Sequence, residues 1–183
     1  MTKAWMLAGV AALSLSACDD NRNTAEPASE AAAEAAGDET LATGLGDNAK
    51  FAAAIKAAGL EAALAGPTPY TVLVPNDAAF DKLPAGAVDT LMKPEARKEL
   101  TAVLTNHILP GTMVAADIGK AIDAGGGRTQ IATLGGGTLT ATRSGDKIVF
   151  ADAAGTRSNV LGADVERSNG VIHQIDAVLM PTT

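Results

Sequence analysis

Between residues 49 and 107, hydrophobic residues recur every three or four positions, which is the spacing of one face of an α-helix. Gly59 directly follows the first such segment, and a glycine in this place commonly ends a helix in a left-handed conformation. Pro94 suits the first turn of the last helix, where its missing N–H is not needed. Helices are therefore predicted over residues 49–58, 60–65, 78–83, 86–92 and 94–107.

One stretch in this region, residues 70–84, combines a strand with a helix. Its apolar, β-branched run 72–74 is typical of a buried strand, and Pro75 should end that strand because it has no N–H for a sheet ladder. The next two residues carry short side-chain oxygens that can cap a helix. We expect a strand that passes directly into a short capped helix, a structural joint without an evident nucleophile or metal ligand. The residues expected to build this joint are Asn76, Asp77 and Phe80.

Beyond Gly111 the pattern changes to short apolar runs separated by glycines and polar residues, which is typical of β-strands and hairpins. Asn169-Gly170 indicates a tight turn, because both residues tolerate positive φ. Helices followed by strands indicate an α+β domain with an antiparallel sheet. The predicted strands cover residues 129–134, 138–143, 147–151, 159–165 and 171–180.

The N-terminus has the pattern of an export signal. Lys3 precedes an apolar run, residues 4–15, which has the length of a signal-peptide core rather than of a membrane span. Leu15-Ser16-Ala17-Cys18 then matches the bacterial lipoprotein cleavage box, in which the thiol receives a diacylglyceryl group. An ordinary secretory signal with an unrelated cysteine is the alternative. We expect residues 1–17 to be a lipoprotein signal peptide and Cys18 to carry the membrane anchor.

The segment after the predicted cleavage site lacks the bulk to form a core. Residues 18–40 are mostly Ala, Glu, Asp, Asn, Pro, Ser and Thr. Such a composition predicts a disordered Ala/Glu-rich linker, which would span roughly 25 Å as a flexible coil. No internal repeat follows it, so residues 41–183 are expected to form one domain.

Composition narrows the possible functions. The formal net charge of the 183 residues is −7, which disfavours nucleic acid and provides no basic patch for anionic lipid. Aromatic residues make up only 3%, so the core must consist mainly of Ala, Val, Leu and Ile. The single cysteine excludes an internal disulfide, and nothing indicates a metal site or another cofactor.

Three segments together carry a resemblance to a known family. YTVLVPNDAAF at 70–80 resembles the first signature box of the fasciclin domain, and NGVIHQIDAVLMP at 169–181 resembles its second box. LTNHILPG at 104–111 resembles the helix end between them. Three matches in the family's order are more specific than one short motif. The resemblance implies a fasciclin-like α+β fold, with N-terminal helices packed against an antiparallel sheet or sandwich wedge, and an extracellular adhesion module.

The resemblance also implies candidate contact residues. In animal members of the family, adhesion is attributed partly to a Tyr-His region and to an Asp-Ile pair shortly before the second box. The corresponding residues here are Asn106-His107 and Asp164-Val165, and no Arg-Gly-Asp sequence occurs. His107 is expected at the end of a helix, where the helix dipole favours an imidazolium. Asp164 could equally be a solvated charge at a strand end.

The second box supplies candidate structural residues, namely Asn169, Gly170 and His173. We hypothesise that His173 hydrogen-bonds the first box near Asn76 or Asp77 and thereby ties the two boxes together. A hydrogen-bonded structural role is commoner for such a histidine than a catalytic one.

Three functions are compatible with these observations. The leading one is an exported, lipid-anchored binding or adhesion module that faces the periplasm or the cell surface and recognises an envelope or matrix protein or polysaccharide. The alternative is a homotypic structural protein of the envelope. An enzyme is the least favoured, because the sequence has no nucleophile elbow, no His-Glu-x-x-His and no phosphate-binding loop. The ligand, the choice of inner or outer membrane, and the oligomeric state remain open.

Overall fold

The structure is a computed structural model that describes residues 39–45 and 48–181. The predicted signal peptide, the lipidation site Cys18 and all but the last two residues of the predicted linker lie outside the described residues.

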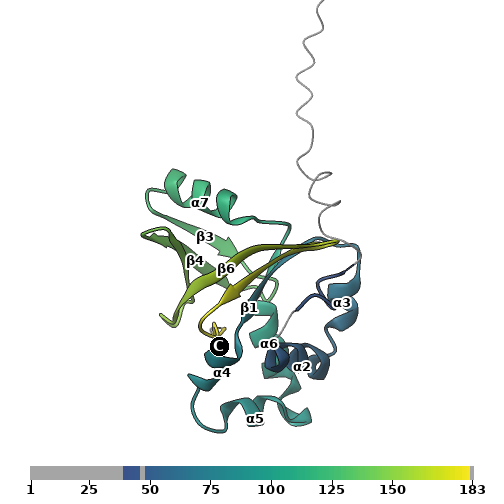
Figure 1. Cartoon of the computed structure of the whole chain (residues 1–183). Coiled ribbons are helices and arrows are strands. Elements are labelled where there is room, and N and C mark those ends of the chain that lie inside the picture. The colour runs from purple at the N-terminus through teal and green to yellow at the C-terminus, as the bar shows by residue number, and fades with distance from the viewer. Residues whose placement is uncertain (1–38, 46–47, 182–183) are drawn as a thin grey trace, which may run out of the picture.

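The helices predicted before residue 107 are all present, and Figure 1 shows them gathered in the lower part of the molecule. The first ends at Gly59, which adopts the left-handed conformation with φ 76°. Asn76 caps the start of the α4 helix, and its side-chain oxygen accepts the Ala79 N–H at 2.8 Å, as predicted from the sequence. These elements are α2 (Ala49–Ala58), α3 (Glu61–Ala65), α4 (Asp77–Asp81), α5 (Ala87–Leu91), η1 (Pro94–Ala96) and α6 (Arg97–Asn106).

The strands form one seven-stranded sheet in the order β2-β1-β7-β6-β5-β4-β3. The Leu134 N–H donates to the Ile108 carbonyl at 2.8 Å, which brings the two outer strands together and nearly closes the sheet on itself. The predicted α+β class, with helices that precede most of the sheet, is confirmed. The strands are β1 (Tyr70–Pro75), β2 (Ile108–Pro110), β3 (Arg128–Ala132), β4 (Thr138–Ser144), β5 (Lys147–Ala151), β6 (Arg157–Arg167) and β7 (Gly170–Ile175).

One strand pair departs from the predicted antiparallel arrangement. β1 and β7 run parallel, from Tyr70 beside Gly170 to Pro75 beside Ile175. Parallel neighbours need a long crossover, and here nearly the whole domain between the two strands supplies it. The two signature boxes therefore contribute adjacent strands, the second and third of the seven counted from the β2 edge.

The core has two main parts, one on each face of β1. Val72 and Val74 pack with α2 and α6, whereas Leu73 packs with the cluster on the other face of the sheet. Burial on both faces explains why the apolar run in this strand is continuous rather than alternating. Its neighbour β7 is divided in the same way, with Ile172 in the first cluster and Ile175 in the second.

One helix was not predicted. The α7 helix (Ala115–Ala124) covers the second core cluster at the end of the molecule opposite α5 (Figure 1). Only Ile118 and Ile122, four residues apart, provide its buried bulk. The remaining residues are small or polar, and a three-glycine run follows, so the sequence pattern of this segment is more typical of a loop than of a helix.

The last strand is shorter than predicted, since β7 ends at Ile175 and not at Met180. In the C-terminal segment (residues 176–181), side chains replace a neighbouring strand as hydrogen-bond partners. The Ala177 N–H donates to the Ser158 hydroxyl at 2.8 Å, and the Met180 N–H donates to the Asp152 carboxylate at 2.9 Å. The second box therefore contains a strand followed by a separately held tail.

Candidate functional site

Asp164 lies in an irregular part of β6. The pairing of β6 with β7 shifts between Val160 and Gly162 and again between Gly162 and Val165. Asp164 has φ 57° and is the non-glycine residue with positive φ within residues 39–45 and 48–181. Aspartate adopts this conformation more readily than bulkier residues, but it remains uncommon. Bulges of this kind re-aim side chains and often lie near functional sites.

The Asp164 carboxylate caps a helix that is distant in the sequence. Its Oδ1 accepts the N–H of Ala115, the first residue of α7, at 2.7 Å. Val114, at the N-cap position, has no side-chain oxygen that could do this. A carboxylate at this end of a helix is also favoured by the helix dipole. The bulge therefore fixes the start of α7, while the Asp164 side chain remains 40% exposed.

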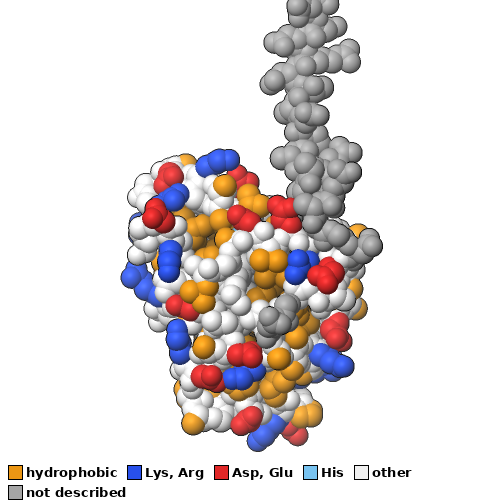
Figure 2. Space-filling model, in the orientation of Figure 1, with side chains coloured by type: hydrophobic (Ala, Val, Ile, Leu, Met, Phe, Trp, Pro, Cys, Tyr) orange, Lys and Arg blue, Asp and Glu red, His pale blue; other side chains and the backbone are white. Residues whose placement is uncertain are grey.

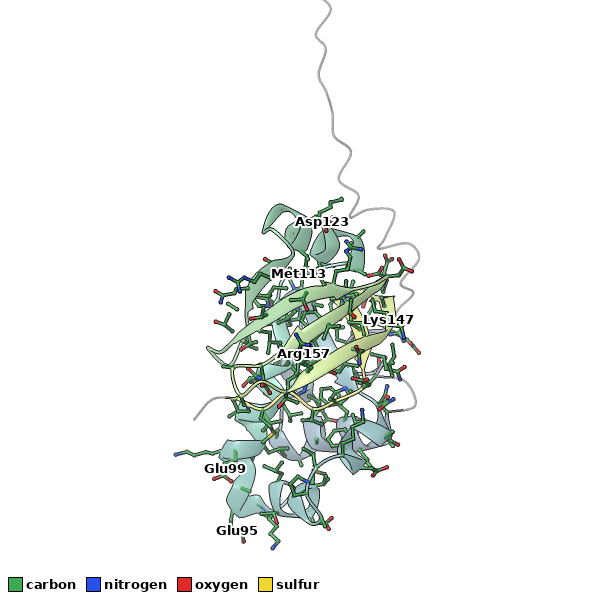
Figure 3. The ribbon with its side chains drawn as sticks, turned by 90° about the vertical axis from the view of Figure 1, so that its left-hand side faces the viewer. Glu95, Glu99, Met113, Asp123, Lys147 and Arg157 are labelled. Atoms are coloured by element: carbon green, nitrogen blue, oxygen red, sulfur yellow. The ribbon has the colours of Figure 1, made fainter. Side chains whose placement is uncertain are left out.

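The buried side chain of His173 hydrogen-bonds the irregular part of β6. The Asp164 N–H donates to His173 Nδ1 at 3.3 Å, so Nε2 carries the proton and donates to the Met113 carbonyl at 2.7 Å. Burial lowers the pKa of this histidine, against the opposing effects of the Met113 carbonyl and the Asp164 carboxylate. The ring is therefore neutral at pH 7. Figure 3 shows Met113 beside α7, at the end of the molecule away from Glu95 and Glu99.

The hypothesis that His173 hydrogen-bonds the first signature box, near Asn76 or Asp77, was wrong. Its ring reaches Met113 and the β6 bulge rather than Asn76 or Asp77. The boxes are joined by the backbone instead, through the pairing of β1 with β7 and a 3.0 Å bond from the Asn76 N–H to the Ile175 carbonyl. In this parallel register His173 lies beside Leu73, so its side chain leaves on the α7 face of the sheet.

Two exposed apolar side chains lie close to Asp164 along β6. Leu161 is 49% exposed and Val165 is 39% exposed, and with Asp164 they define what we call the β6 surface. Figure 2 shows hydrophobic side chains exposed on the face where Figure 1 places β6. Leu161 was not among the residues expected from the sequence to contact a partner. Val160-Leu161 could have indicated it, because neighbouring residues of a strand point to opposite faces, and in a strand with one face open to solvent one of the two is exposed.

Asn106 and His107, in contrast, are buried, with 3% and 1% exposure. The Leu179 N–H donates to His107 Nε2 at 3.0 Å, and the Leu179 carbonyl accepts a hydrogen bond from the Asn106 side-chain amide at 3.2 Å. Both residues thus hold the C-terminal segment. The resemblance implied that these two side chains contact a partner directly. Their burial corrects this expectation, because neither side chain reaches the surface of the fold.

The protonation state of His107 follows from its partners. Because Nε2 accepts a bond, Nδ1 carries the proton and donates to the Val103 carbonyl at 2.7 Å. Burial lowers the pKa to about 4, although the Val103 carbonyl and the Asp152 charge oppose this. The expected imidazolium at the helix end was therefore wrong, because desolvation outweighs the helix dipole. The ring also meets Phe51 edge-on at a centroid distance of 6.1 Å.

The other signature residues form structural contacts. Asn169 accepts the Leu41 N–H and donates to two carbonyls of the α3 region, each at 2.7 Å, and so fastens the start of the domain to the β6–β7 turn. Gly170 has φ 153°, and a Cβ there would lie 2.0 Å from the Tyr70 carbonyl oxygen. Asp77 accepts the Lys50 N–H at 3.2 Å, and Phe80 is half-buried in the helical region.

Comparison with known proteins identifies the family. The Fasciclin domain model matches residues 46–181. Protein sll1483 from Synechocystis is 38% identical over 147 residues, which cover 80% of this chain and 71% of that protein. Cell surface glycolipoprotein MPB83 from Mycobacterium bovis is 36% identical over 112 residues, 61% of this chain and 44% of that one. The chain belongs to the fasciclin domain family.

A solved structure supports the fold. The FAS1 domain pair from the insect cell adhesion molecule Fasciclin I superposes with a TM-score of 0.59 and 21% identity, over 72% of this chain and 44% of that one. The chain thus spans less than half the length of this protein and of MPB83. The family consists of adhesion and surface proteins, which confirms on family grounds that the chain is not an enzyme.

Two further properties concern the described residues alone. Within residues 39–45 and 48–181, no helix has the length and apolar character needed to cross a bilayer. In the same part of the chain, no group of three or more His, Cys, Asp or Glu side chains is arranged to hold a metal ion.

Proposed function

We propose that the protein is a membrane-tethered binding module, exported from a bacterial cytoplasm, that recognises a protein or polysaccharide of the envelope through its β6 surface. The lipid anchor would be carried by Cys18. The cleavage box before this residue supports the anchor, as does the similarity to a mycobacterial protein named a cell surface glycolipoprotein. The family's adhesion and surface proteins support the binding role.

One observation carries the choice of the β6 surface. Asp164 keeps an uncommon backbone conformation and an exposed carboxylate, and a buried histidine holds both in place. Strained residues persist only where surrounding structure over-determines them, and they cluster at ligand contacts. The carboxylate can accept hydrogen bonds from hydroxyl or amide groups, while Leu161 and Val165 offer apolar contact. This combination suits a polar ligand with an apolar face.

Capture from solubilised envelope and matrix tests the proposal. The full-length chain is immobilised as wild type, Asp164→Asn and Leu161→Ser. Asparagine retains an oxygen for the Ala115 N–H and tolerates positive φ, so this change removes the charge while keeping the cap. We expect a saturable protein or polysaccharide partner that both variants hold at least about 5-fold more weakly, as loss of about 1 kcal/mol implies.

Leu134→Ser is the matched control, because Leu134 is 45% exposed but lies outside β6. It should bind the partner as the wild type does. Equal binding by all four proteins would contradict the β6 surface. Capture of the chain by itself alone would instead support homotypic assembly, with concentration-dependent sedimentation as the direct check.

The anchor has its own test. Cys18→Ser removes the thiol that would accept the lipid. We expect the wild type in the membrane fraction with incorporated labelled palmitate, and the variant unlabelled and released from the membrane by high salt. An unlabelled wild type would contradict lipidation at Cys18 and leave the binding proposal to be judged by capture alone.

A further inference from the structure

One side of the sheet is not covered by any of the described helices. Leu139, Ala141 and Phe150 pack with α7 in the second core cluster. In the register of β3, β4, β5 and the start of β6, the alternate side chains therefore point to the opposite side. Figure 3 is viewed toward these strands, and no helix of the described residues lies in front of them. We call this side the open face, and its polar side chains include Arg128, Gln130, Thr140, Thr142, Lys147 and Arg157.

The centre of the open face is polar but uncharged. Thr140 lies beside Gln130 on one neighbouring strand, and Thr142 lies beside Val149 on the other. Both threonines are half-buried, whereas Gln130 is exposed. Val149 is 6% exposed, and the remaining outward apolar residues of β3 and β5 are alanines. The face therefore offers hydroxyl and amide groups rather than an apolar contact.

Three cations lie around this centre, on three different strands. Arg128 begins β3, Lys147 begins β5 and Arg157 begins β6, and all three residues are exposed. In the part of the chain that the structure describes, none of them forms an ion pair. Arg143, which lies on the α7 side of the same sheet, pairs with Asp123 of α7 at 3.2 Å. The cation on the covered side is thus neutralised, whereas those on the open face are available to a ligand.

Acidic residues near the open face do not balance these charges. The outward positions of β3, β4, β5 and residues 157–159 contain no Asp or Glu. At the edges, Asp152 is buried and accepts two backbone N–H groups, and Asp176 accepts hydrogen bonds from β6 and pairs with Lys82. Asp146, in the turn between β4 and β5, is exposed. A surface of mainly one sign attracts ligands of the opposite sign, so the open face favours an anionic partner although the whole chain is acidic.

We propose that the open face binds an acidic polysaccharide, a polymer of uronate sugars, with sugar carboxylates at the three cations and sugar hydroxyls at Thr140 and Gln130. Arginine suits carboxylates because its guanidinium can bind both oxygens. Threonine and glutamine can donate to hydroxyl groups and accept from them. A lipid surface is less suitable, because insertion needs exposed apolar side chains, which this face lacks. The contacts used here do not include Leu161, Asp164 or Val165, so this proposal does not rest on the β6 surface.

Binding of alginate, a polyuronate, tests the proposal on the full-length chain at about 50 mM salt, where exposed charges are weakly screened. The open-face variant combines Arg128→Gln, Lys147→Gln and Arg157→Gln. Its matched control removes three exposed cations of the helical region, through Lys56→Gln, Lys93→Gln and Lys98→Gln. We expect at least about tenfold weaker binding by the open-face variant and a change below about twofold in the control, since each exposed ion pair contributes up to about fivefold. Both variants lose the same charge, so the control measures the effect of net charge alone.

The variant Thr140→Val tests the uncharged part of the face. It removes one hydroxyl at nearly the same volume and should weaken binding of alginate about threefold. Dextran, a neutral polysaccharide, should not bind the wild type. Unchanged binding of alginate by Thr140→Val would overturn the role of the hydroxyl, and binding of dextran as tight as that of alginate would overturn the role of the cations.

Equal loss of binding by the two triple variants, or no binding of alginate by the wild type, would overturn the proposal. Tighter binding of phosphatidylglycerol vesicles than of alginate would overturn the choice of a polysaccharide. If the open-face variant does not fold, as judged by circular dichroism, the single change Arg157→Gln is compared with Lys98→Gln. Arg157→Gln should bind about threefold more weakly than Lys98→Gln, and equal binding by the two would contradict the site.

Discussion

The two histidines of this protein use the same chemistry in opposite settings. Each is buried and neutral, and each joins two backbone groups through its two ring nitrogens. The tautomers are reversed, since His107 carries its proton on Nδ1 and His173 on Nε2. His107 lies wholly inside the core and closes the C-terminal segment onto α6. His173 lies beneath the surface and holds the exposed Asp164.

This difference separates stability from function. A buried histidine bonded only to buried groups can act only on the folding equilibrium. A buried histidine bonded to a strained surface residue also fixes where that residue's side chain points. The family motif around Asn106-His107 is therefore structural here, whereas Asp164 and its neighbours remain available to a partner.

Substitution His107→Ala should have the largest effect on folding. It leaves the Val103 carbonyl and the Leu179 N–H without their partner and opens a cavity beside Phe51. We expect a loss of about 4 kcal/mol in the free energy of unfolding, measured by urea denaturation. A loss below about 1 kcal/mol would show that the C-terminal segment does not depend on this ring.

Acid should weaken the same region. The pKa of His107 falls from its ordinary value of 6.5 to about 4 in the folded protein, so the unfolded chain takes up the proton first as pH falls. The corresponding stability is complete above pH 6.5 and is lost between 6.5 and about 4, in total about 3 kcal/mol. Urea titrations across this range measure it, and NMR of the ring should show no titration of His107 above pH 5.

His173→Ala should cost less, about 2 kcal/mol, because its partners lie closer to solvent. Its distinctive result is local. Amide exchange at the first turn of α7 should accelerate, since Met113 and the bulge lose their common partner. The same exchange should stay unchanged in a surface variant of equal stability loss. Uniform acceleration across the domain would contradict a positioning role.

Changes at Asp164 itself should affect stability least. Asp164→Ala loses the cap on Ala115 and should cost about 1 kcal/mol, whereas Asp164→Asn keeps an acceptor and should cost under about 0.5 kcal/mol. Thermal unfolding measures both. A large loss from Asp164→Asn would mean that the charge serves folding, and the argument for its availability to a partner would fail.

The sequence was sufficient to predict those elements whose structure depends on residues within the same segment. The helix of residues 49–58 was predicted to its last residue, because its apolar stripe and Gly59 are local signals. The Asn76 cap was also predicted, since the cap and its helix are neighbours. The helix over 115–124 was missed, because its two isoleucines have meaning only against a core cluster built from distant strands.

The candidate site was less predictable for the same reason. Asp164 was singled out by resemblance, but its bond to Ala115 spans 49 residues, and no local pattern announces such a contact. The burial of His107 and the reach of His173 to Met113 likewise depend on how distant segments pack. Residue type indicated a polar partner for each histidine, whereas only the fold determines which one.

Hydrogen–deuterium exchange on the full-length chain, with and without its captured envelope partner, tests the central claim most directly. We predict protection in residues 160–166 and at the first turn of α7, with no change in the C-terminal segment that His107 holds. Protection confined to the helical end, or exchange that the partner leaves unchanged throughout β6, would contradict the assignment of the β6 surface as the binding site.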